Sequence, residues 1–314
     1  MDTNILKIKI AKLYYQNRLS KVEIGKKLRI SRLTVAQCLD NALKEGLVKI
    51  TIDEPKNSFI DLENKLEDKF KIHRAIIVES SLGYEQTKKD IGKAAAMYFT
   101  DIVYEGDVIG IAWGTTIYEM LNYLPSTINN KDTTVVQITG GLNQVKMEYN
   151  AIELTSRLVK ILNSKSYQLF APSIVESEDA QKMFLSESAI KSTIEMFDKV
   201  NIAIVGIGTV IPEPSSLLYL DGFIKKSDVD SIRSTNAIGD INSYFYDSEG
   251  RECITDLKNR VIGMDLSKLR KVRYAIGVAG GKTKADAIYS ALKGKIINVI
   301  ITDREVAEEI LRKY

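Results

Sequence analysis

The chain has 314 residues, of which 45% are hydrophobic and 27% charged, a composition ordinary for a globular protein of about two domains. It contains two cysteines and one histidine, which argues against a disulfide framework and against a cysteine- or histidine-rich metal site. The N-terminal residues lack the apolar core of a signal peptide, and no apolar run reaches the roughly 18 residues of a membrane helix. We therefore expect a cytoplasmic protein without a membrane segment.

The net charge of +3 is distributed unevenly along the chain. Residues 1–54 contain 11 Lys and Arg against 6 Asp and Glu, a net charge of +5, whereas the remaining residues carry −2. Positive charge concentrated in one segment is typical of a nucleic-acid-binding domain, although a solvated basic helix has the same composition.

Three short helices are predicted in the basic segment. The first covers about Ile5–Tyr15, and its apolar spacing predicts that Ile5, Ile8, Leu13 and their apolar neighbours form a buried stripe. Such a stripe would pack against the helices that follow it.

The next two helices are marked by their capping residues. Ser20 can accept the backbone amide of Glu23 while the Glu23 carboxylate reaches back, which is a capping box. Ser31 is placed to cap the third helix, and Gly46 to end it. The buried face of this third helix is predicted to consist of Val35, Leu39 and Ala42. This arrangement is typical of a helix-turn-helix, and a strand over Leu47–Ile52 would add a wing.

The exposed face of the third helix carries side chains that can bond to phosphates and base edges. The residues predicted to contact double-stranded operator DNA are Ser31, Arg32, Thr34, Gln37 and Asn41. A three-helix bundle that contacts another protein is the alternative interpretation.

A polar break at residues 53–58 separates an N-terminal domain, residues 1–54, from residues 55–314. A linker helix over 59–70 is predicted next. Its apolar positions are Phe59, Leu62, Leu66 and Phe70. Their spacing fits either packing against a core or a coiled-coil seam between two subunits.

From Arg74 onward, short β-rich runs alternate with helical stretches. The predicted strands are Ala75–Val78, Val108–Ala112, Thr134–Ile138, Tyr167–Phe170, Val200–Val205, Tyr274–Val278 and Ile297–Ile301. The main helical stretches are Lys88–Tyr104, Glu148–Leu162, Lys282–Leu292 and Arg304–Lys313. Alternation of this kind predicts a doubly wound α/β fold, with helices on both faces of a parallel sheet and ligands beyond the carboxyl ends of its strands.

Four glycine-containing loops follow predicted strands at that edge. They are Trp113–Thr116, Thr139–Gly141, Gly206–Thr209 and Ala279–Lys284. In the first of them, a glycine allows close approach of a ligand, two threonines supply hydroxyls, and a helix N-terminus favours an anion. N-capping is the alternative role of Thr115 and Thr116, and a solvated helical turn is that of Lys282 and Lys284. Asp240 could accept sugar hydroxyls or turn amides with equal ease.

Many of these segments, taken in order, resemble one family. The segments are Ala11–Tyr15, Ile30–Val35, Glu45–Val48, Trp113–Thr116, Gly206–Thr209, Ala237–Asp240, Tyr244–Gly250, Ile262–Met264, Ala279–Ile288 and Asn298–Asp303. In this order they are similar to the SorC-type sugar-binding transcriptional regulators, close to the branch of deoxyribonucleoside regulators. The resemblance covers nearly the whole chain.

The resemblance implies an effector domain with the fold of sugar-phosphate isomerases and deaminases but without enzymatic activity or a cofactor. It implies a repressor that is released from DNA by a phosphosugar or related carbohydrate, and that forms homodimers or homotetramers. The residues expected at the effector are Trp113, Gly114, Thr115, Thr116, Thr139, Gly140, Gly141, Gly206, Gly208, Asp240 and Lys284.

Two departures from the family pattern are visible. Thr139 stands where members of the family often carry Lys or Arg, and threonine can neither form a Schiff base nor pair with a phosphate charge. Ala36 and Gln37 replace a frequent Ser-Arg pair in the recognition helix, so the operator sequence should differ. The alternative function is an isomerase- or deaminase-like enzyme with an appended DNA-binding segment, but no paired carboxylates for acid–base catalysis are evident.

Overall fold

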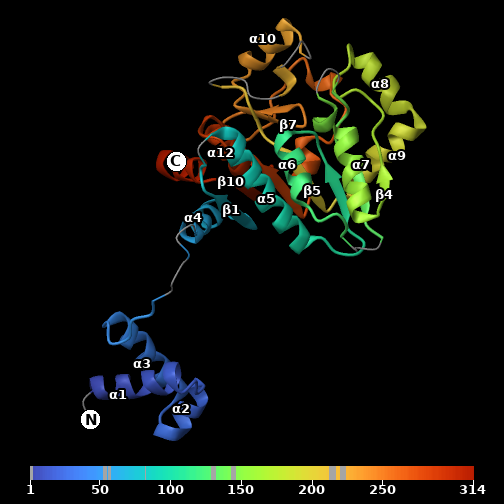
Figure 1. Cartoon of the computed structure of the whole chain (residues 1–314). Helices are drawn as coiled ribbons and strands as arrows, with labels where there is room; N and C mark the ends of the chain where they lie inside the picture. Colours follow the sequence, from blue (N-terminus) through green and yellow to red (C-terminus); the bar gives the residue numbers. More distant parts are fainter. Residues whose placement is uncertain are drawn as a thin grey trace. The chain divides into compact units, whose positions relative to one another are not determined.

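A computed structural model of the chain describes residues 3–51, 55, 58–81, 83–128, 132–142, 146–211, 217–219 and 224–314. The chain forms two compact units, Met1–Ser58 and Phe59–Tyr314, whose elements are labelled in Figure 1. The predicted boundary between residues 54 and 55 falls in a segment of which only Pro55 and Ser58 are described, so it stays a prediction. Within the described ranges, no helix is both long and apolar enough to cross a membrane.

The N-terminal unit is built from helices. These are α1 (Thr3–Ala11), the π-helical turn η1 (Lys12–Gln16), α2 (Lys21–Leu28) and α3 (Arg32–Lys44). They pack around a small buried cluster of Ile10, Ala11, Ile24, Val35 and Leu39. The predicted buried face of the third helix is confirmed, since Val35, Leu39 and Ala42 are all buried.

The predicted buried stripe of the first helix is wrong at Ile5 and Ile8 and right at Leu13. Ile5 and Ile8 are 57% and 41% exposed, whereas Ile10 is fully buried and Leu6 and Leu13 pack beside it. The first helix has apolar residues on more than one side, so its periodicity alone does not identify the side that faces α3.

The caps form as predicted, but the wing does not. Ser20 Oγ accepts the amide of Glu23 at 3.2 Å while the Ser20 amide donates to Glu23 Oε2 at 2.8 Å. Ser31 Oγ accepts the amide of Thr34 at 3.0 Å. Residues 47–51 are not in a strand, and Ile52 lies outside the described residues. A strand needs a paired neighbour, and the described part of this unit contains no other strand.

The larger unit contains a parallel seven-stranded sheet in the order β1-β10-β9-β5-β2-β3-β4. The strands are β1 (Arg74–Val78), β2 (Val108–Ile111), β3 (Thr134–Gln137), β4 (Lys165–Tyr167), β5 (Ile202–Gly206), β9 (Tyr274–Val278) and β10 (Val299–Asp303). The fourth strand ends earlier than predicted because the amide of Leu169 donates to the Gln137 side chain rather than to a neighbouring strand.

Helices cover both faces of this sheet, which confirms the doubly wound α/β fold. The helices are α4 (Ile60–Phe70), α5 (Tyr84–Ile102), α6 (Thr115–Tyr123), α7 (Ala151–Leu162), α8 (Glu178–Ser186), α9 (Ser188–Met196), α10 (Lys226–Ser234), α11 (Leu266–Leu269), α12 (Ala285–Lys293) and α13 (Arg304–Lys313). Short 3₁₀ turns are η2 (Met147–Tyr149), η3 (Phe197–Lys199), η4 (Leu217–Tyr219), η5 (Lys258–Arg260) and η6 (Lys282–Lys284). Figure 1 shows α5, α6 and α7 side by side on one face. The connections that run back across the sheet place α9 and α12 on the other face, because parallel crossovers are right-handed, and α13 packs against α12.

A second, antiparallel sheet was not predicted. It consists of β6 (Gly208–Thr209), β7 (Gly239–Ile241) and β8 (Tyr244–Tyr246). Asn242 and Ser243, which join β7 to β8, have φ angles of 55° and 68°, the left-handed values of a two-residue hairpin turn. Strands this short are too brief for an alternating pattern to reveal.

The linker helix α4 belongs to the core of the larger unit. Leu66 is fully buried, Phe70 is 8% exposed, and Phe59 and Leu62 pack against the same core, so the core alternative for this stripe is confirmed. Its glutamates also bind the open edge of β1: Glu67 Oε1 accepts the amide of Ala75 at 2.9 Å, and Glu63 Oε1 accepts that of Ile77 at 3.0 Å.

These edge contacts make a measurable contribution to stability. Glu67→Leu is expected to lower the free energy of unfolding by about 1–3 kcal/mol, because the partly buried Ala75 amide loses its acceptor. Glu67→Gln keeps an acceptor oxygen and should cost less. Urea denaturation would measure both, with Asp68→Leu as a control at a carboxylate that is 86% exposed. Equal losses in the leucine variants would contradict the expectation.

Candidate functional site

The pocket of interest lies where the winding of the large sheet reverses. From β2 the chain proceeds to β3 and β4, whereas from β5 it proceeds to β9 and β10, so neighbouring strands β2 and β5 lead in opposite directions. Ligands of open α/β sheets bind at the carboxyl ends of the strands at such a point. The loops that follow β2 and β5 begin at Ala112 and Ile207, and both loops line the pocket.

The pocket encloses about 520 Å³, including the space at its mouth. The residues that line it are Ala112, Trp113, Gly114, Thr115, Thr116, Ile117, Gly206, Ile207, Gly208, Asp240, Asn242, Val278 and Lys284. Eight of the eleven predicted effector residues are therefore brought together. The three that are not are Thr139, Gly140 and Gly141.

One wall of the pocket is the N-terminus of α6. Gly114 is the N-cap, with a φ of 152° that side-chain-bearing residues rarely adopt. No side chain caps this helix, so the capping alternative for Thr115 and Thr116 does not hold. Helix geometry leaves the first-turn amides without intrahelical acceptors, and together with the helix dipole they favour an anion.

Lys284 supplies the positive charge. It lies in η6, after β9, and its Nζ donates to the carbonyl oxygen of Ile207 at 2.8 Å. Burial, together with the positive charge of Lys88, lowers the pKa of Lys284 to about 8, while Asp240 acts in the opposite direction. The solvated-turn alternative fits Lys282, which is exposed, but not Lys284.

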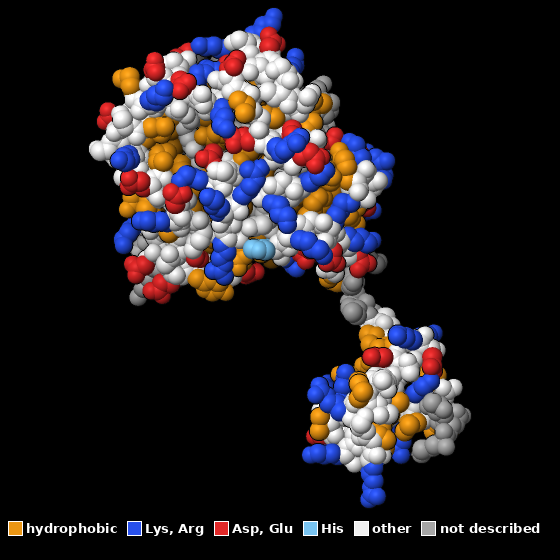
Figure 2. All heavy atoms as spheres, turned by 180° about the vertical axis from the view of Figure 1, so that it is seen from behind, with side chains coloured by type: hydrophobic (Ala, Val, Ile, Leu, Met, Phe, Trp, Pro, Cys, Tyr) orange, Lys and Arg blue, Asp and Glu red, His pale blue; other side chains and the backbone are white. Residues whose placement is uncertain are grey.

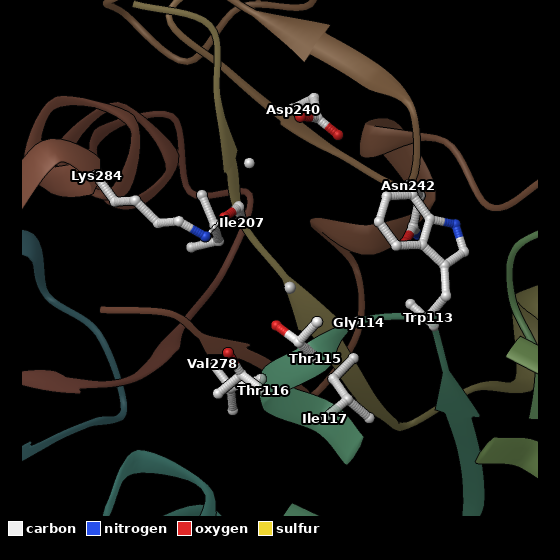
Figure 3. A pocket seen from close by; sticks show the side chains of 13 residues that line it. Trp113, Gly114, Thr115, Thr116, Ile117, Ile207, Asp240, Asn242, Val278 and Lys284 are labelled. Atoms are coloured by element: carbon white, nitrogen blue, oxygen red, sulfur yellow. Dashed lines mark hydrogen bonds between the residues drawn. The ribbon is translucent and has the colours of Figure 1, made fainter. Parts of the chain in front are cut away.

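The antiparallel sheet positions the polar groups facing this lysine. Asp240 pairs with Gly208 across β7 and β6 and is only 2% exposed. In Figure 3 the Lys284 side chain enters across from Trp113 and Asn242. Among the described residues, neither Trp113 Nε1 nor Asn242 Oδ1 has a hydrogen-bond partner, although both atoms are buried. Buried polar atoms are nearly always satisfied, so this pair indicates a donor and an acceptor left for a ligand.

Asn242 was not predicted as a site residue. Its turn gives a usable signal, because an Asn-Ser pair between two apolar segments favours a tight hairpin. The remaining unpredicted lining residues are small or apolar: Ala112, Ile117, Ile207 and Val278.

The segment Thr139–Gly141 does not line this pocket. Thr139 is fully buried, and its Oγ1 is 3.5 Å from Ser173 Oγ. A Cβ on Gly140 would clash with the backbone of Pro172, so this glycine serves close packing. A position directly after a strand is therefore not enough to predict an effector-binding residue. The loop after β3 bonds to residues 171–173 and does not contribute to the pocket.

The candidate DNA-binding surface lies on α3. Arg32, Gln37 and Asn41 are exposed, whereas Ser31 and Thr34 bond to each other through their hydroxyls at 2.8 Å within the cap. A Cβ on Gly25 would lie 2.8 Å from the carbonyl oxygen of Ile30, so a glycine allows the tight turn between α2 and α3. On the face of the N-terminal unit shown in Figure 2, Lys and Arg side chains predominate over Asp and Glu.

Other chemistry finds little support in the described residues. The imidazole of His73 packs edge-on against Tyr274, with 5.8 Å between ring centroids. Within the described ranges, no group of three or more His, Cys, Asp or Glu side chains lies close enough to hold a metal ion.

Comparisons with known proteins cover both units. Residues 54–312 match the family model described as "Putative sugar-binding domain". The chain is 32% identical over 308 residues to the deoxyribonucleoside regulator of Bacillus subtilis, covering 98% of this chain and 97% of that protein. It is 28% identical over 307 residues to the sorbitol operon regulator of Klebsiella pneumoniae, covering 97% of each chain. The crystal structure of the full-length sorbitol operon regulator SorC from that organism aligns with a TM-score of 0.76, at 28% identity and 99% coverage of both chains.

Proposed function

The chain belongs to the SorC-type family of sugar-binding transcriptional regulators, and from this premise we propose that it binds operator DNA and releases it when a phosphorylated sugar fills the pocket at β2 and β5. The observation that supports a phosphorylated ligand is the position of Lys284 near the uncapped N-terminus of α6. The partly buried ammonium of Lys284 and the free amides of α6 converge on one pocket and together favour a phosphate.

The rest of the pocket suits the sugar. The carboxylate of Asp240 accepts hydroxyl groups, and Trp113 Nε1 and Asn242 Oδ1 offer one donor and one acceptor. The site is small and polar, which fits a pentose or hexose phosphate better than a nucleotide. Thr139 is fully buried, does not line the pocket and carries no amine, so the proposal includes no Schiff base at this position.

A regulator is favoured over the isomerase or deaminase alternative. Both relatives described above carry the names of regulators, and the similarity includes the helix-turn-helix. We further propose that the protein acts in the cytoplasm, where the operator DNA is, and as a homodimer or homotetramer. Twofold operators are the usual targets of helix-turn-helix proteins.

The proposal is tested by linking ligand binding to DNA binding. A thermal-shift screen would compare phosphorylated pentoses and hexoses with their unphosphorylated forms, since a ligand of the folded state raises the melting temperature. Fluorescence anisotropy on a fragment of the adjacent promoter would then measure operator affinity. We expect a stabilising phosphosugar to weaken operator binding by about 5- to 150-fold, the usual range of such coupling. A phosphosugar that stabilises the protein without changing operator affinity would contradict the proposal.

The recognition helix gives a second prediction. Arg32→Ala and Gln37→Ala are each expected to weaken operator binding by about 10- to 100-fold, because both side chains are exposed on α3 and lose about 1–3 kcal/mol of base or phosphate contact. Anisotropy at two salt concentrations separates the roles: loss of a phosphate contact also lowers the salt dependence. Lys9→Ala, an exposed substitution on α1, is the control for charge alone. Unchanged operator affinity in both α3 variants would overturn this assignment.

A further inference from the structure

The first turns of α5 contain a buried lysine that the site described above does not include. Lys88 is only 8% exposed. It begins the buried face of this helix, which continues with Ile91, Gly92, Ala95 and Phe99. Lysine is almost never buried unless its charge is paired, and here the pair is made with Glu85, whose side chain is mostly exposed.

Lys88 lies over the loop that leads from β9 to Lys284. Tyr84, Lys88 and Ile91 share one face of α5, since they are four and three residues apart. The residues on either side of Lys88 contact that loop: a Cβ on Gly281 would lie 2.9 Å from the Tyr84 ring, and a Cβ on Gly280 would clash with Ile91. The turns of α5 that carry Lys88 therefore pack on Gly280 and Gly281.

Lys284 lies in the 3₁₀ turn that follows these two glycines. Its backbone amide donates to the carbonyl oxygen of Gly281 at 2.8 Å, and its side chain lines the pocket. The two ammonium groups are close enough for the charge of Lys88 to contribute to the lowered pKa of Lys284. Two like charges that approach one another in a partly buried site favour an anion that neutralises both.

The present partner of Lys88 is easily displaced. Lys88 Nζ lies 2.8 Å from Glu85 Oε1 and 5.1 Å from the centroid of the Tyr84 ring. The side chain of Glu85 is 77% exposed, whereas that of Lys88 is 10% exposed. An ion pair with one solvated member is weak, so little is lost when Glu85 turns to water and a doubly charged anion takes its place.

We propose that Lys88 is a specificity-determining residue of the effector pocket, which together with Lys284 holds a phosphate monoester and selects phosphorylated over neutral sugars. This inference rests on the proposed function and deepens it. Glu85 holds the Lys88 side chain in place while the pocket is empty. Asp240 and Asn242, on the other side of Lys284, are left to bind sugar hydroxyls.

The test measures anion binding directly, with inorganic phosphate as the probe and the full chain as the protein. Isothermal titration at constant ionic strength would compare the wild type with Lys88→Met, which preserves the length of the side chain but removes its charge. We expect phosphate binding to weaken by about 10-fold or more, the effect of one lost charge-assisted hydrogen bond. Lys89→Met is the matched control, because Lys89 is the exposed neighbour and its loss changes the net charge equally. Its phosphate affinity should stay within twofold of the wild type.

Two further readouts distinguish a binding role from a structural one. Glu85→Gln removes the competitor at an exposed position that should not affect folding, and we expect it to tighten phosphate binding up to about fivefold. Lys88→Met should raise the pKa of Lys284, visible as an upward shift of the pH at which phosphate binding declines. A Lys88→Met chain that fails to fold would leave the Glu85→Gln result to decide.

Several results would overturn the inference. They are wild-type phosphate affinity in Lys88→Met, equal losses in Lys88→Met and Lys89→Met, or weaker binding in Glu85→Gln. Failure of the regulatory proposal gives a different result. The wild type would bind phosphate and Lys88→Met would not, which supports the inference, but no phosphosugar would change the operator affinity of the wild type. If instead operator affinity responds to a phosphosugar equally in the wild type and in Lys88→Met, the inference fails and the regulatory proposal stands.

Discussion

Lys284→Met is expected to change ligand affinity and stability in opposite directions. Loss of the ammonium should weaken phosphosugar binding by about 100-fold, because a charge-assisted hydrogen bond contributes about 1.5–3 kcal/mol and the pocket also loses a Coulombic attraction. The ligand-free protein should become about 1–3 kcal/mol more stable at pH 7. The pKa of Lys284 is lowered to about 8, which means that the charged form of this lysine destabilises the folded chain at pH 7. Methionine removes this destabilisation, but the gain in stability is partly offset because the hydrogen bond to the carbonyl oxygen of Ile207 is lost.

The pH dependence of this effect has a definite sign. Between about pH 8 and the ordinary lysine pKa of 10.5, the unfolded chain keeps a proton that folded Lys284 has released. The free energy of unfolding of the wild type therefore rises with pH across this window, and the stability advantage of Lys284→Met over the wild type becomes smaller. Phosphosugar affinity falls over the same range, because a neutral amine attracts the phosphate less.

Urea denaturation and isothermal titration at pH 7 and pH 10 would measure both effects. Lys282→Met, at the exposed lysine of the same turn, is the matched control and should leave stability and affinity nearly unchanged. Lower stability of Lys284→Met at pH 7 would show that the burial cost has been misjudged. Undiminished phosphosugar affinity would remove Lys284 from the binding site.

Ile24→Ala should abolish operator binding while leaving the effector pocket intact. Ile24 is fully buried in the small cluster that joins α1, α2 and α3. Truncation of such a side chain costs about 2–5 kcal/mol, and a unit of this size has only a few kcal/mol of stability in total. The helix-turn-helix would therefore be largely unfolded at 37 °C.

The effects of Ile24→Ala on operator binding and on ligand binding can be measured separately, because the two functions are assigned to different units. Their cores are distinct, so the phosphosugar affinity of Ile24→Ala should remain within about twofold of the wild type, as expected for independent sites. Anisotropy measures operator binding and isothermal titration measures the ligand. Val22→Ala, an apolar truncation in the same helix at a position 48% exposed, should retain operator binding. Loss of binding in Val22→Ala as well would point to a contact surface rather than to the core.

The sequence predicted correctly those features that are determined by residues close together in the chain. Ser20 and Ser31 cap helices through bonds to residues three positions away, and both were identified correctly. The inner strands of the large sheet, β2, β3, β5, β9 and β10, are buried on both faces, so they stand out as apolar runs, whereas the exposed edge strand β4 does not. In the pocket, Thr115, Thr116 and Lys284 were predicted because each follows a strand that ends at the same edge.

The errors arose where distant packing decides. Periodicity allowed Ile5 and Ile8 to be buried, but α3 packs on the side of Ile10 instead. The loop at Gly140 has the composition of a ligand loop, yet it packs against Pro172. Lys88 looks like one more charge on a polar turn, and its burial arises where α5 packs on the loop near residue 280, a relation that no local pattern encodes.

The carboxylates of α4 also bear on how copies of this protein can meet. A free sheet edge invites a strand from another molecule, because its outward amides await acceptors. Here the amides of Ala75 and Ile77 on β1 are already taken by Glu67 and Glu63, and the opposite edge strand, β4, is only three residues long. Growth of a continuous sheet from one molecule to the next is thus disfavoured at both ends. The proposed dimer or tetramer would then form through the helical faces and loops, and the same arrangement protects a sheet rich in valine and isoleucine from aggregation.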